Sequence, residues 1–450
     1  MIVCKFGGTS VANPAAIGRL AEIVRGRAGE EPVVVVSALA GVTDALIGLA
    51  RTAYGGDAAA VADSIAALVR RHEETALALP GATAALDAIG ADVAALHDDL
   101  SAALGRMLRP AELDAVAGRG ELWSSRLIGA ALEGAGLPAT WLDIRQIMVT
   151  DDRFGRATPY TQVVNTRARE CLGPVIRAGR IPVTQGYIGA TADGAPTTLG
   201  RGGSDFTAAV LGAALAAHRV EIWTDVDGLM TADPRIVPSA RTLTAASYEE
   251  AAELATFGAK VLHPAIAMPL VRAGIPIVVL NSTHPDRPGT TIEPSAELER
   301  VGDSPIRSIS WKRGITVVNV RAPRMLGAYG FLRAMFEVFE RHEVVVDVLA
   351  SGEVSVSLTV EDRSRLDPVV RELSDMGEVW VEHGRAIVAV VGIGLRTTPG
   401  IAARLFRAVQ PTNVEVISQG ASAINMTFVV REEDGPDVVR RLHQEFFGSC

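Results

Sequence analysis

Thr198-Leu199-Gly200-Arg201-Gly202-Gly203-Ser204-Asp205 is a glycine-framed turn that leads into an alanine-rich run of helical character. Glycines let backbone N–H groups approach an anion closely, and the beginning of a helix adds partial positive charge. Arg201 supplies a planar fork that suits a carboxylate or a phosphate, and Ser204 can cap the helix. The stretch therefore predicts an anion-binding turn, although many glycine-rich turns are only tight turns.

A second glycine turn, Phe6-Gly7-Gly8-Thr9-Ser10, follows an apolar strand that we predict over residues 2–5. Asn13 can cap the next helix, and Pro14 suits its first position. Lys5 then lies where the strand ends and the turn begins. It can contact a phosphate there or be an ordinary solvated lysine, and the dipeptide alone leaves both interpretations open.

The strand predicted over residues 33–36 is apolar throughout, which is typical of a parallel strand covered on both faces. A loop of small residues, 37–43, follows it. Ligands of open α/β sheets gather at such carboxyl ends of strands, so Ser37 and Thr43 are candidate ligand hydroxyls. Thr43 could equally be only a helix cap.

Gly118-Arg119-Gly120-Glu121 interrupts a longer helical pattern. Two glycines inside a helix cost stability, so we expect a substrate or another chain to approach closely here. Glu121 could then accept a hydrogen bond from a substrate ammonium. In the alanine-rich helical hairpins predicted over residues 57–104, His72 and His97 are expected to face solvent.

Strands and helices alternate through residues 1–292, which predicts a mostly parallel, three-layer α/β sandwich. Further strands are predicted over residues 137–142, 181–184, 220–223 and 275–280. Between the first two of these, the polar loop Asp151-Asp152-Arg153-Phe154-Gly155 is expected to lie over the site.

The C-terminal part of the chain repeats a βαββαβ pattern. Gly330-Phe331 matches Gly400-Ile401 at an offset of 70 residues (400 − 330), and Asp347 matches Glu415 at an offset of 68 (415 − 347). Two ferredoxin-like modules are therefore predicted. The boundaries that we expect are 1–292 for the first domain, 305–384 for the first module and 385–450 for the second.

Composition excludes several classes of protein. The chain has 450 residues and a formal net charge of −9, and its Lys/Arg blocks are no longer than short pairs, which argues against nucleic acid or an anionic membrane as the main partner. Its three cysteines are widely spaced and form no metal-ligand pattern. The opening residues lead directly into a strand without a secretory leader, and the apolar runs are too short to span a bilayer. A cytoplasmic protein is expected.

Taken together, these motifs resemble the aspartate kinases of the amino-acid kinase superfamily. The matching stretches lie in the expected order across the whole first domain: 5–11, 118–121, 200–205, 224–228, 233–235 and 257–264. The C-terminal modules resemble the paired ACT domains of that family. Residues 346–348 and 352–356 look closest to the monofunctional, lysine-inhibited class.

The resemblance implies ATP- and Mg²⁺-dependent phosphorylation of the side-chain carboxylate of L-aspartate. The product is 4-phospho-L-aspartate, from which lysine, threonine and methionine are made. The nucleophile is a carboxylate with an ordinary pKa of about 3.9, already ionised at neutral pH, so no general base is required. Alignment and charge neutralisation must then supply the catalysis. There is no Walker-type loop, so a different loop design must bind the phosphates.

The resemblance also implies roles for individual residues. Lys5 and Asp205 would be catalytic, with Lys5 on the transferring phosphate and Asp205 orienting Lys5 or the metal ion. Aspartate would be held by a group in which Arg201 takes the α-carboxylate and Glu121 the α-ammonium: Ser37, Thr43, Glu121, Arg201, Gly202 and Ser204. The nucleotide would contact Lys5, Gly7, Gly8, Thr224, Asp225, Met230, Arg235, Lys260 and Val261. No side chain is expected to be a dedicated metal ligand.

Regulation by an amino acid, with lysine as the expected effector, is implied in the same way. The compatible effector-site residues are Met325, Phe331, Leu332, Val346, Asp347, Ser351 and Glu353. The chain departs from the family pattern at Met230, where relatives often carry a tyrosine. It also carries Ala328, Val345 and Gly352 where lysine-inhibited relatives have serines. A homodimer or tetramer formed through the ACT modules is expected.

Two alternatives remain. A kinase of the same superfamily could phosphorylate another acid, such as glutamate, or a nucleotide, but the pairing of Arg201 with Glu121 and the two ACT-like modules count against it. An amino-acid sensor that has lost kinase activity is the second alternative. Intact Lys5, Arg201 and Asp205 count against that one.

Overall fold

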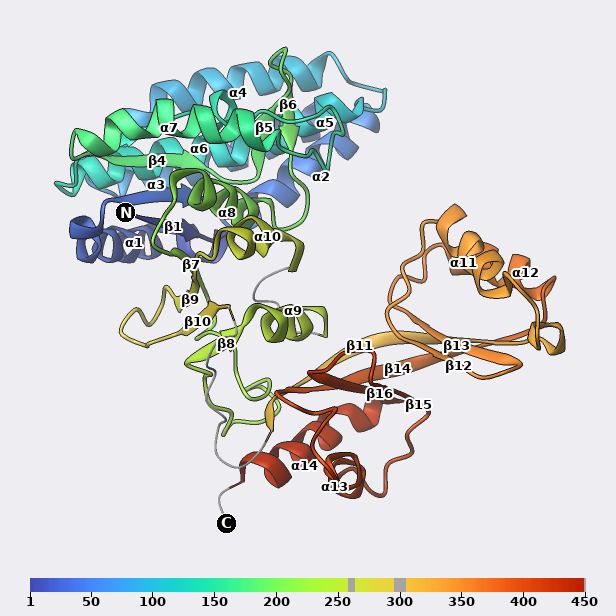
Figure 1. Ribbon diagram of the computed structural model, residues 1–450. Coiled ribbons are helices and arrows are strands. Elements are labelled where there is room, and N and C mark those ends of the chain that lie inside the picture. Colours follow the sequence, from blue (N-terminus) through green and yellow to red (C-terminus); the bar gives the residue numbers. More distant parts are fainter. Residues whose placement is uncertain (258–263, 295–304, 449–450) are drawn as a thin grey trace. The chain divides into compact units, whose positions relative to one another are not determined.

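The computed structural model describes residues 1–257, 264–294 and 305–448, in two compact units (Figure 1). The first unit contains Met1–Leu229, Thr244–Tyr248 and Val261–Ala296. The second contains Met230–Leu243, Glu249–Lys260 and Glu297–Cys450. Of the residues predicted to bind nucleotide, Lys260 and Val261 lie outside the described residues.

The first unit is built on a sheet of eight described strands in the order β3-β4-β2-β1-β7-β9-β10-β8. All neighbours pair in parallel except β9 and β10, so the predicted mostly parallel sheet is confirmed. The strands are β1 (Ile2–Phe6), β2 (Pro32–Val36), β3 (Ala139–Trp141), β4 (Ile181–Gln185), β7 (Val220–Thr224), β8 (Ala245–Ser247), β9 (Ile277–Asn281) and β10 (Thr290–Glu293). A separate hairpin is formed by β5 (Ile188–Ala190) and β6 (Pro196–Thr198).

Helices cover both faces of this sheet, which confirms the three-layer sandwich. On one face α6 (Arg119–Gly134) packs on β2, β3 and β4, next to α1 (Pro14–Gly26). On the other face lie α7 (Thr161–Arg177), α8 (Gly203–Leu215) and α10 (Pro264–Ala273). Outside α6 lie α2 (Val42–Tyr54), α3 (Ala58–Leu77), α4 (Leu86–Ser101) and α5 (Pro110–Ala117).

Helix α1 begins as the sequence predicts. Asn13 accepts a hydrogen bond from the Ala16 N–H at 3.0 Å, and Pro14 is the first helical residue. The first turn after β1 is the short 3₁₀ helix η1 (Gly8–Val11). The cap and the proline together fix where the chain turns back over the sheet.

The break between α5 and α6 at Gly118 is also as predicted, but the close approach comes from the chain itself. A Cβ atom at Gly120 would lie 2.9 Å from both Ala38 Cβ and Val42 Cγ1. Gly120 therefore lets α6 pack directly against the loop after β2. This contact brings Glu121 beside that loop.

One histidine prediction is wrong. His97 is exposed as expected, but His72 is fully buried, with Nδ1 donating to the Leu68 carbonyl oxygen at 2.8 Å. Its ring meets Trp123 of α6 edge to face, with ring centroids 5.2 Å apart. Because α3 packs on α6, the face that carries His72 lies in the helical layer, and burial lowers the pKa of His72.

The second unit contains an antiparallel sheet in the order β12-β13-β11-β14-β16-β15. Its strands are β11 (Ile306–Arg321), β12 (Leu349–Ser351), β13 (Ser355–Val360), β14 (Glu378–Gly392), β15 (Val416–Gln419) and β16 (Asn425–Arg431). Its helices are α9 (Tyr248–Thr256), α11 (Phe331–Arg341), α12 (Leu366–Ser374), α13 (Ile401–Ala408) and α14 (Gly435–Phe447). The two central strands, β11 and β14, run through both modules (Figure 1).

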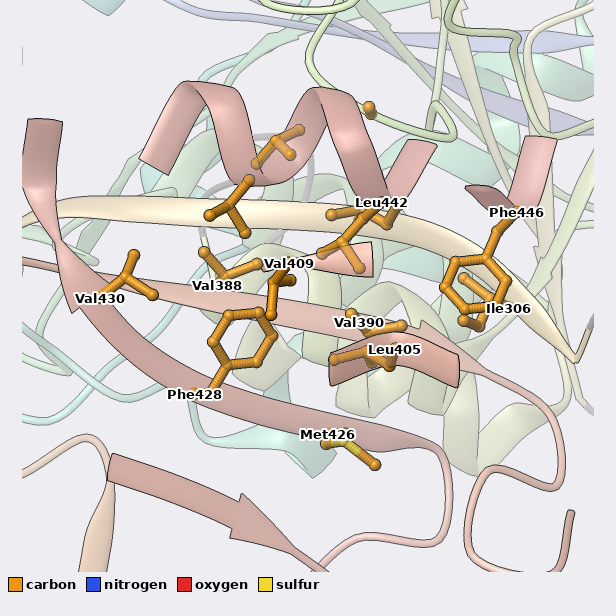
Figure 2. Close-up of a cluster of buried hydrophobic side chains, with 14 of the residues drawn as sticks. Ile306, Val388, Val390, Leu405, Val409, Met426, Phe428, Val430, Leu442 and Phe446 are labelled. Atoms are coloured by element: carbon orange, nitrogen blue, oxygen red, sulfur yellow. The ribbon is translucent and has the colours of Figure 1, made fainter. Parts of the chain in front are cut away.

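Each module has its own hydrophobic core. In the first, α11 and α12 pack on β11 and β13 through side chains such as Phe339 and Leu358. In the second, α13 and α14 pack on β14 and β16, with Leu405, Leu442 and Phe428 at the centre (Figure 2). Ile306, at the beginning of β11, belongs to this second core, so the first part of β11 packs with the second module.

Among the described residues, no helix combines the length and the apolar character that a membrane-spanning segment needs.

The close packing at Gly120 can be tested by Gly120→Ala. Its new Cβ would overlap Ala38 and Val42, and overpacking of this kind costs about 1–3 kcal/mol, so the midpoint of thermal unfolding should fall. Gly90→Ala is the matched control, because a Cβ there meets nothing within 4 Å on α4 and alanine is the better helix former by about 1 kcal/mol. Calorimetry of both variants checks this, and a midpoint that rises equally in both would contradict the packing.

Candidate active site

A pocket of about 650 Å³ opens in the first unit, where the glycine turns after β1 and β2 meet the beginning of α8. It brings together all eight of the predicted catalytic and substrate-binding residues. Its lining includes Lys5, Gly8, Ser37, Thr43, Glu121, Arg201, Gly202, Ser204 and Asp205. These residues come from stretches that lie up to 200 positions apart (205 − 5), and their individual roles stay predictions.

The Lys5 ammonium is held in the pocket by Asp205, with Nζ and Oδ1 2.6 Å apart. The Lys5 side chain is 10% exposed and that of Asp205 18%, so water screens this ion pair only weakly. Asp205 lies in the first turn of α8, where the helix dipole favours a carboxylate. The pair therefore fixes the Lys5 ammonium beside the amino end of α8. The ammonium and the helix end together form a site for an anion.

The Gly200–Asp205 turn differs from the prediction in its cap. Gly202, with φ of 72°, is the N-cap of α8, and among the described side chains none caps this helix. Ser204 is the second residue of the helix, because the left-handed conformation that precedes α8 falls on Gly202. Ser204 instead packs against Gly186, where a Cβ atom would lie 2.5 Å from Ser204 Cβ.

Glu121 is a buried acid with an unused acceptor. Thr43 donates to its Oε1 at 3.4 Å, whereas Oε2 is buried without a hydrogen-bond partner in the described part of the chain. Burial raises the pKa of Glu121 to about 8, against smaller opposing contributions from nearby backbone amides and the Thr43 hydroxyl. A buried carboxyl oxygen that lines a pocket and lacks a donor suits a ligand whose ammonium can donate a hydrogen bond to it.

Asp114 is a residue that the sequence reasoning missed. From α5 it accepts hydrogen bonds from Gly155 N at 2.8 Å, Thr198 N at 2.7 Å and Thr198 Oγ1 at 2.9 Å. It thereby ties the 151–155 loop and β6 together just before the Gly200–Asp205 turn. Gly155 lines the pocket, so this loop does border the site as predicted.

Arg71 is a second residue that the sequence reasoning missed. Like Asp114, it acts through contacts to segments far away in the sequence. Its guanidinium donates to the carbonyl oxygens of Ala40 at 2.8 Å and Ala12 at 3.2 Å. These two residues belong to the loop after β2 and the segment after η1. Arg71 therefore fixes the spacing of the two loops that face the pocket.

The predicted nucleotide residues are distributed differently. Thr224 and Asp225 lie where β7 ends, and Ser282 Oγ donates to the Thr224 carbonyl oxygen at 3.1 Å. Neither residue lines the pocket in the described structure. Met230 and Arg235 belong to the second unit, and the exposed Arg235 pairs with Asp233 at 2.7 Å.

The predicted effector residues lie in the second unit, around the amino end of α11 and the β12–β13 hairpin. Phe331 and Leu332 begin α11, Ser351 ends β12, and Glu353 lies in the turn that follows. Met325 and Val346 pack at the margin of the first module's core. Asp347 faces Lys312 of β11, with Nζ 3.4 Å from Oδ1.

Comparison with known proteins agrees with the fold of both units. A model of the amino acid kinase family matches residues 1–281, and a model of an ACT domain matches residues 388–446. The lysine-sensitive aspartokinase 3 of Escherichia coli K12 is 38% identical over 467 aligned residues, which cover 99% of each chain. The chloroplastic aspartokinase 3 of Arabidopsis thaliana is 34% identical, over 99% of this chain and 81% of its own length.

Solved structures give the same result for the fold. Escherichia coli aspartokinase III in complex with aspartate and ADP, described as the R-state, has a TM-score of 0.86 at 37% identity, over 99% of this chain and all of its own. The same enzyme in complex with lysine and aspartate, the T-state, has a TM-score of 0.84 at 37% identity, over 99% of each chain.

The raised pKa of Glu121 makes a prediction about stability. The folded protein keeps the carboxyl proton of Glu121 until about pH 8, whereas an unfolded glutamate loses it near pH 4.3. The contribution of this group to the free energy of unfolding is therefore complete below about pH 4.3. It is then lost as the pH rises, by at most about 1.4 kcal/mol per pH unit, until the folded group ionises. Denaturant unfolding of the ligand-free protein between pH 5 and 9 measures this slope.

Glu121→Gln should remove that part of the pH dependence. Glu73→Gln, at an exposed glutamate of α3, is the control and should keep it. Equal slopes in all three proteins would show that Glu121 is not held neutral.

Proposed function

Because the chain belongs to the amino acid kinase family and is an aspartate kinase, we propose that its pocket holds L-aspartate between Arg201 and Glu121. In this position the side-chain carboxylate of the substrate points toward the γ-phosphate of ATP. That carboxylate accepts the phosphoryl group as ADP leaves, and the Lys5 ammonium contacts the transferring phosphate. The observation that carries the proposal is the buried, unpartnered Oε2 of Glu121 in the same pocket as the Lys5–Asp205 pair.

The two ends of the substrate backbone need opposite charges. Arg201 offers a planar guanidinium for the α-carboxylate, which it can bind through two parallel hydrogen bonds. Glu121 Oε2 accepts from the α-ammonium, and Thr43 orients the other oxygen of the same carboxylate. Ser37, Gly202 and Ser204 line the same pocket and complete the substrate contacts.

Transfer needs alignment and charge neutralisation rather than a base. The attacking carboxylate is ionised at neutral pH, since its ordinary pKa is about 3.9. Lys5 lies where negative charge develops on the phosphoryl group, and Asp205 keeps it there through the 2.6 Å ion pair. The Gly8 amide, whose residue lines the pocket, and the amides at the beginning of α8 add donors that require no reorganisation.

A divalent cation fits this site as a companion of the nucleotide. Among the described residues, no group of three or more His, Cys, Asp and Glu side chains could hold a metal ion. Mg²⁺ is usually bound through substrate phosphates and one or two carboxylates, and Asp205 is the acid within the pocket at the end that carries Lys5. When bound with ATP, Mg²⁺ would neutralise phosphate charge.

We propose that the nucleotide contacts Lys5, Gly7 and Gly8 and a further group of residues. These further contacts are Thr224, Asp225, Met230, Arg235, Lys260 and Val261. The end of β7 supports the first two of these. Gly7 N donates to the Trp223 carbonyl oxygen at 3.1 Å, so the glycine turn and the end of β7 are joined directly. A phosphate on the Gly7-Gly8 turn would therefore lie next to Thr224.

The C-terminal modules are proposed to be regulatory ACT domains that bind lysine, as the lysine-bound relative suggests. We propose the boundaries 1–292 for the catalytic domain and 305–384 and 385–450 for the two modules, with one refinement. Ile306 and Ile309 pack in the core of the second module, which supports a discontinuous second domain that includes the first part of β11. Assembly into a homodimer or tetramer through these domains, and a cytoplasmic location, are proposed with them.

Arg201→Ala should raise the KM for aspartate by roughly 100-fold and leave the KM for ATP within about threefold, because a charge-assisted pair is worth about 1.5–3 kcal/mol. Aspartyl hydroxamate formed in the presence of ATP, Mg²⁺ and aspartate measures both constants. Arg201→Lys keeps the charge without the planar fork, so its KM for aspartate should lie between those of the unmodified chain and of Arg201→Ala. An equal rise of both KM values would contradict the assigned role, and absence of hydroxamate with the folded, unmodified chain would contradict the activity.

Lysine, added at rising concentration, should inhibit this activity, whereas threonine and methionine should not. Asp347→Asn should weaken the inhibition roughly tenfold, relative to the variant's own uninhibited rate, because a hydrogen bond to a charged group is lost. Inhibition by threonine or methionine alone would show that the effector is wrongly assigned while the kinase assignment stands.

A further inference from the structure

The carboxylate of Asp347 is already occupied, loosely, by an ammonium of the chain itself. Lys312 Nζ lies 3.4 Å from Asp347 Oδ1 and 2.9 Å from Glu361 Oε2. The side chains of Lys312 and Asp347 are 17% and 14% exposed, whereas that of Glu361 is 63% exposed. The lysine is thus shared between a buried acid and an exposed one.

This occupation leaves Asp347 incompletely satisfied. Its Oδ2 atom is buried and has no hydrogen-bond partner within the described residues. Burial raises the pKa of Asp347, and Lys312 only partly opposes that effect. A buried carboxylate oxygen without a donor is costly, so a ligand that brings a donor to it gains affinity.

The corresponding acid of the second module is in a different state. Glu415, which matches Asp347 in the repeat, accepts from Arg385 Nε at 2.5 Å, and Arg385 also donates to the His383 carbonyl oxygen at 2.8 Å. A guanidinium fixed by several hydrogen bonds is a better-organised partner than a single ammonium. Of the two matched positions, the first module's is therefore the one open to exchange.

We propose that Lys312 is an internal competitor of the effector, and that its ammonium must be displaced from Asp347 when the ammonium of an amino acid binds there. This inference rests on the proposed function only in taking Asp347 as an effector contact. It adds a residue outside the predicted effector set that determines how much lysine the enzyme tolerates before it is inhibited.

Displacement is feasible because Lys312 keeps a partner. Glu361 lies at the nearer distance, 2.9 Å, and its exposure lets the displaced ammonium move toward water. The effector can then bond to both oxygens of Asp347, including the Oδ2 atom that Lys312 does not satisfy. The Lys312 ammonium thus raises the effector concentration needed for binding at Asp347 without blocking the site.

Lys312→Gln removes the competitor and should lower the lysine concentration for half-inhibition roughly fivefold, which corresponds to about 1 kcal/mol for a partly exposed ion pair. Glu361→Gln should act in the opposite sense, raising that concentration about two- to fivefold, because Lys312 then has Asp347 as its remaining acid. Titration calorimetry of lysine binding to the full chain should show the same order of affinities. Each inhibition curve is normalised to the variant's own rate without lysine.

Arg313→Gln is the matched control. It removes a neighbouring positive charge from the same strand, at an exposed residue that makes no ion pair in the described structure, and should leave half-inhibition unchanged. An equal shift in Arg313→Gln and Lys312→Gln would overturn the inference in favour of a general charge effect. An unchanged half-inhibition in Lys312→Gln, with the unmodified chain inhibited by lysine, would also overturn it.

The failure of the effector assignment is a separate outcome. If lysine binds neither the unmodified chain nor Lys312→Gln, both the assignment of lysine and the competition are wrong. If lysine binds Lys312→Gln but not the unmodified chain, the competition is supported in its strongest form.

Discussion

The Lys5–Asp205 ion pair is the interaction on which the site depends. It joins the end of the first strand to the first turn of α8, across 200 residues of sequence (205 − 5), at 2.6 Å. Removing two charges from water is costly unless they are paired well, so this pair requires β1 and α8 to lie in one particular relation. The parallel order of β2, β1 and β7 provides that relation, because it gathers the turns after these strands at one edge of the sheet.

Local patterns predict local structure well in this chain. The Asn13 cap with Pro14, the continuous apolar run of β2 and the repeated modules all follow from residues near one another in sequence. Contacts between distant segments could not be predicted in that way. Asp114 and Arg71 have no local motif, since each acts through hydrogen bonds to loops that only the folded chain brings near. His72 was wrongly placed because a helix outside the sheet is here covered by another helix.

The two regulatory modules are not independent in construction. Strands β11 and β14 pair along most of their length, so each contributes to both halves of one antiparallel sheet. The first part of β11 packs in the second module's core, while its later residues, such as Val318 and Val320, pack in the first. Lys312 lies near the bulge between these two parts. The ion pair with Lys312 therefore connects Asp347 to the strand that both cores share.

Glu121 and Asp347 present the same physical situation in the two units. Each is an acid with one oxygen engaged within the chain and the other buried without a partner in the described residues. Such an arrangement costs stability in the free protein, and a ligand ammonium would relieve that cost. The difference lies in the internal partner. Thr43, a neutral hydroxyl, orients Glu121 without competing for it, whereas Lys312 carries the same charge as the ligand. A substrate site gains affinity from an acceptor oxygen that no internal cation occupies. A regulatory site gains from an internal ammonium that competes with the effector, because the effector then binds only above a certain concentration.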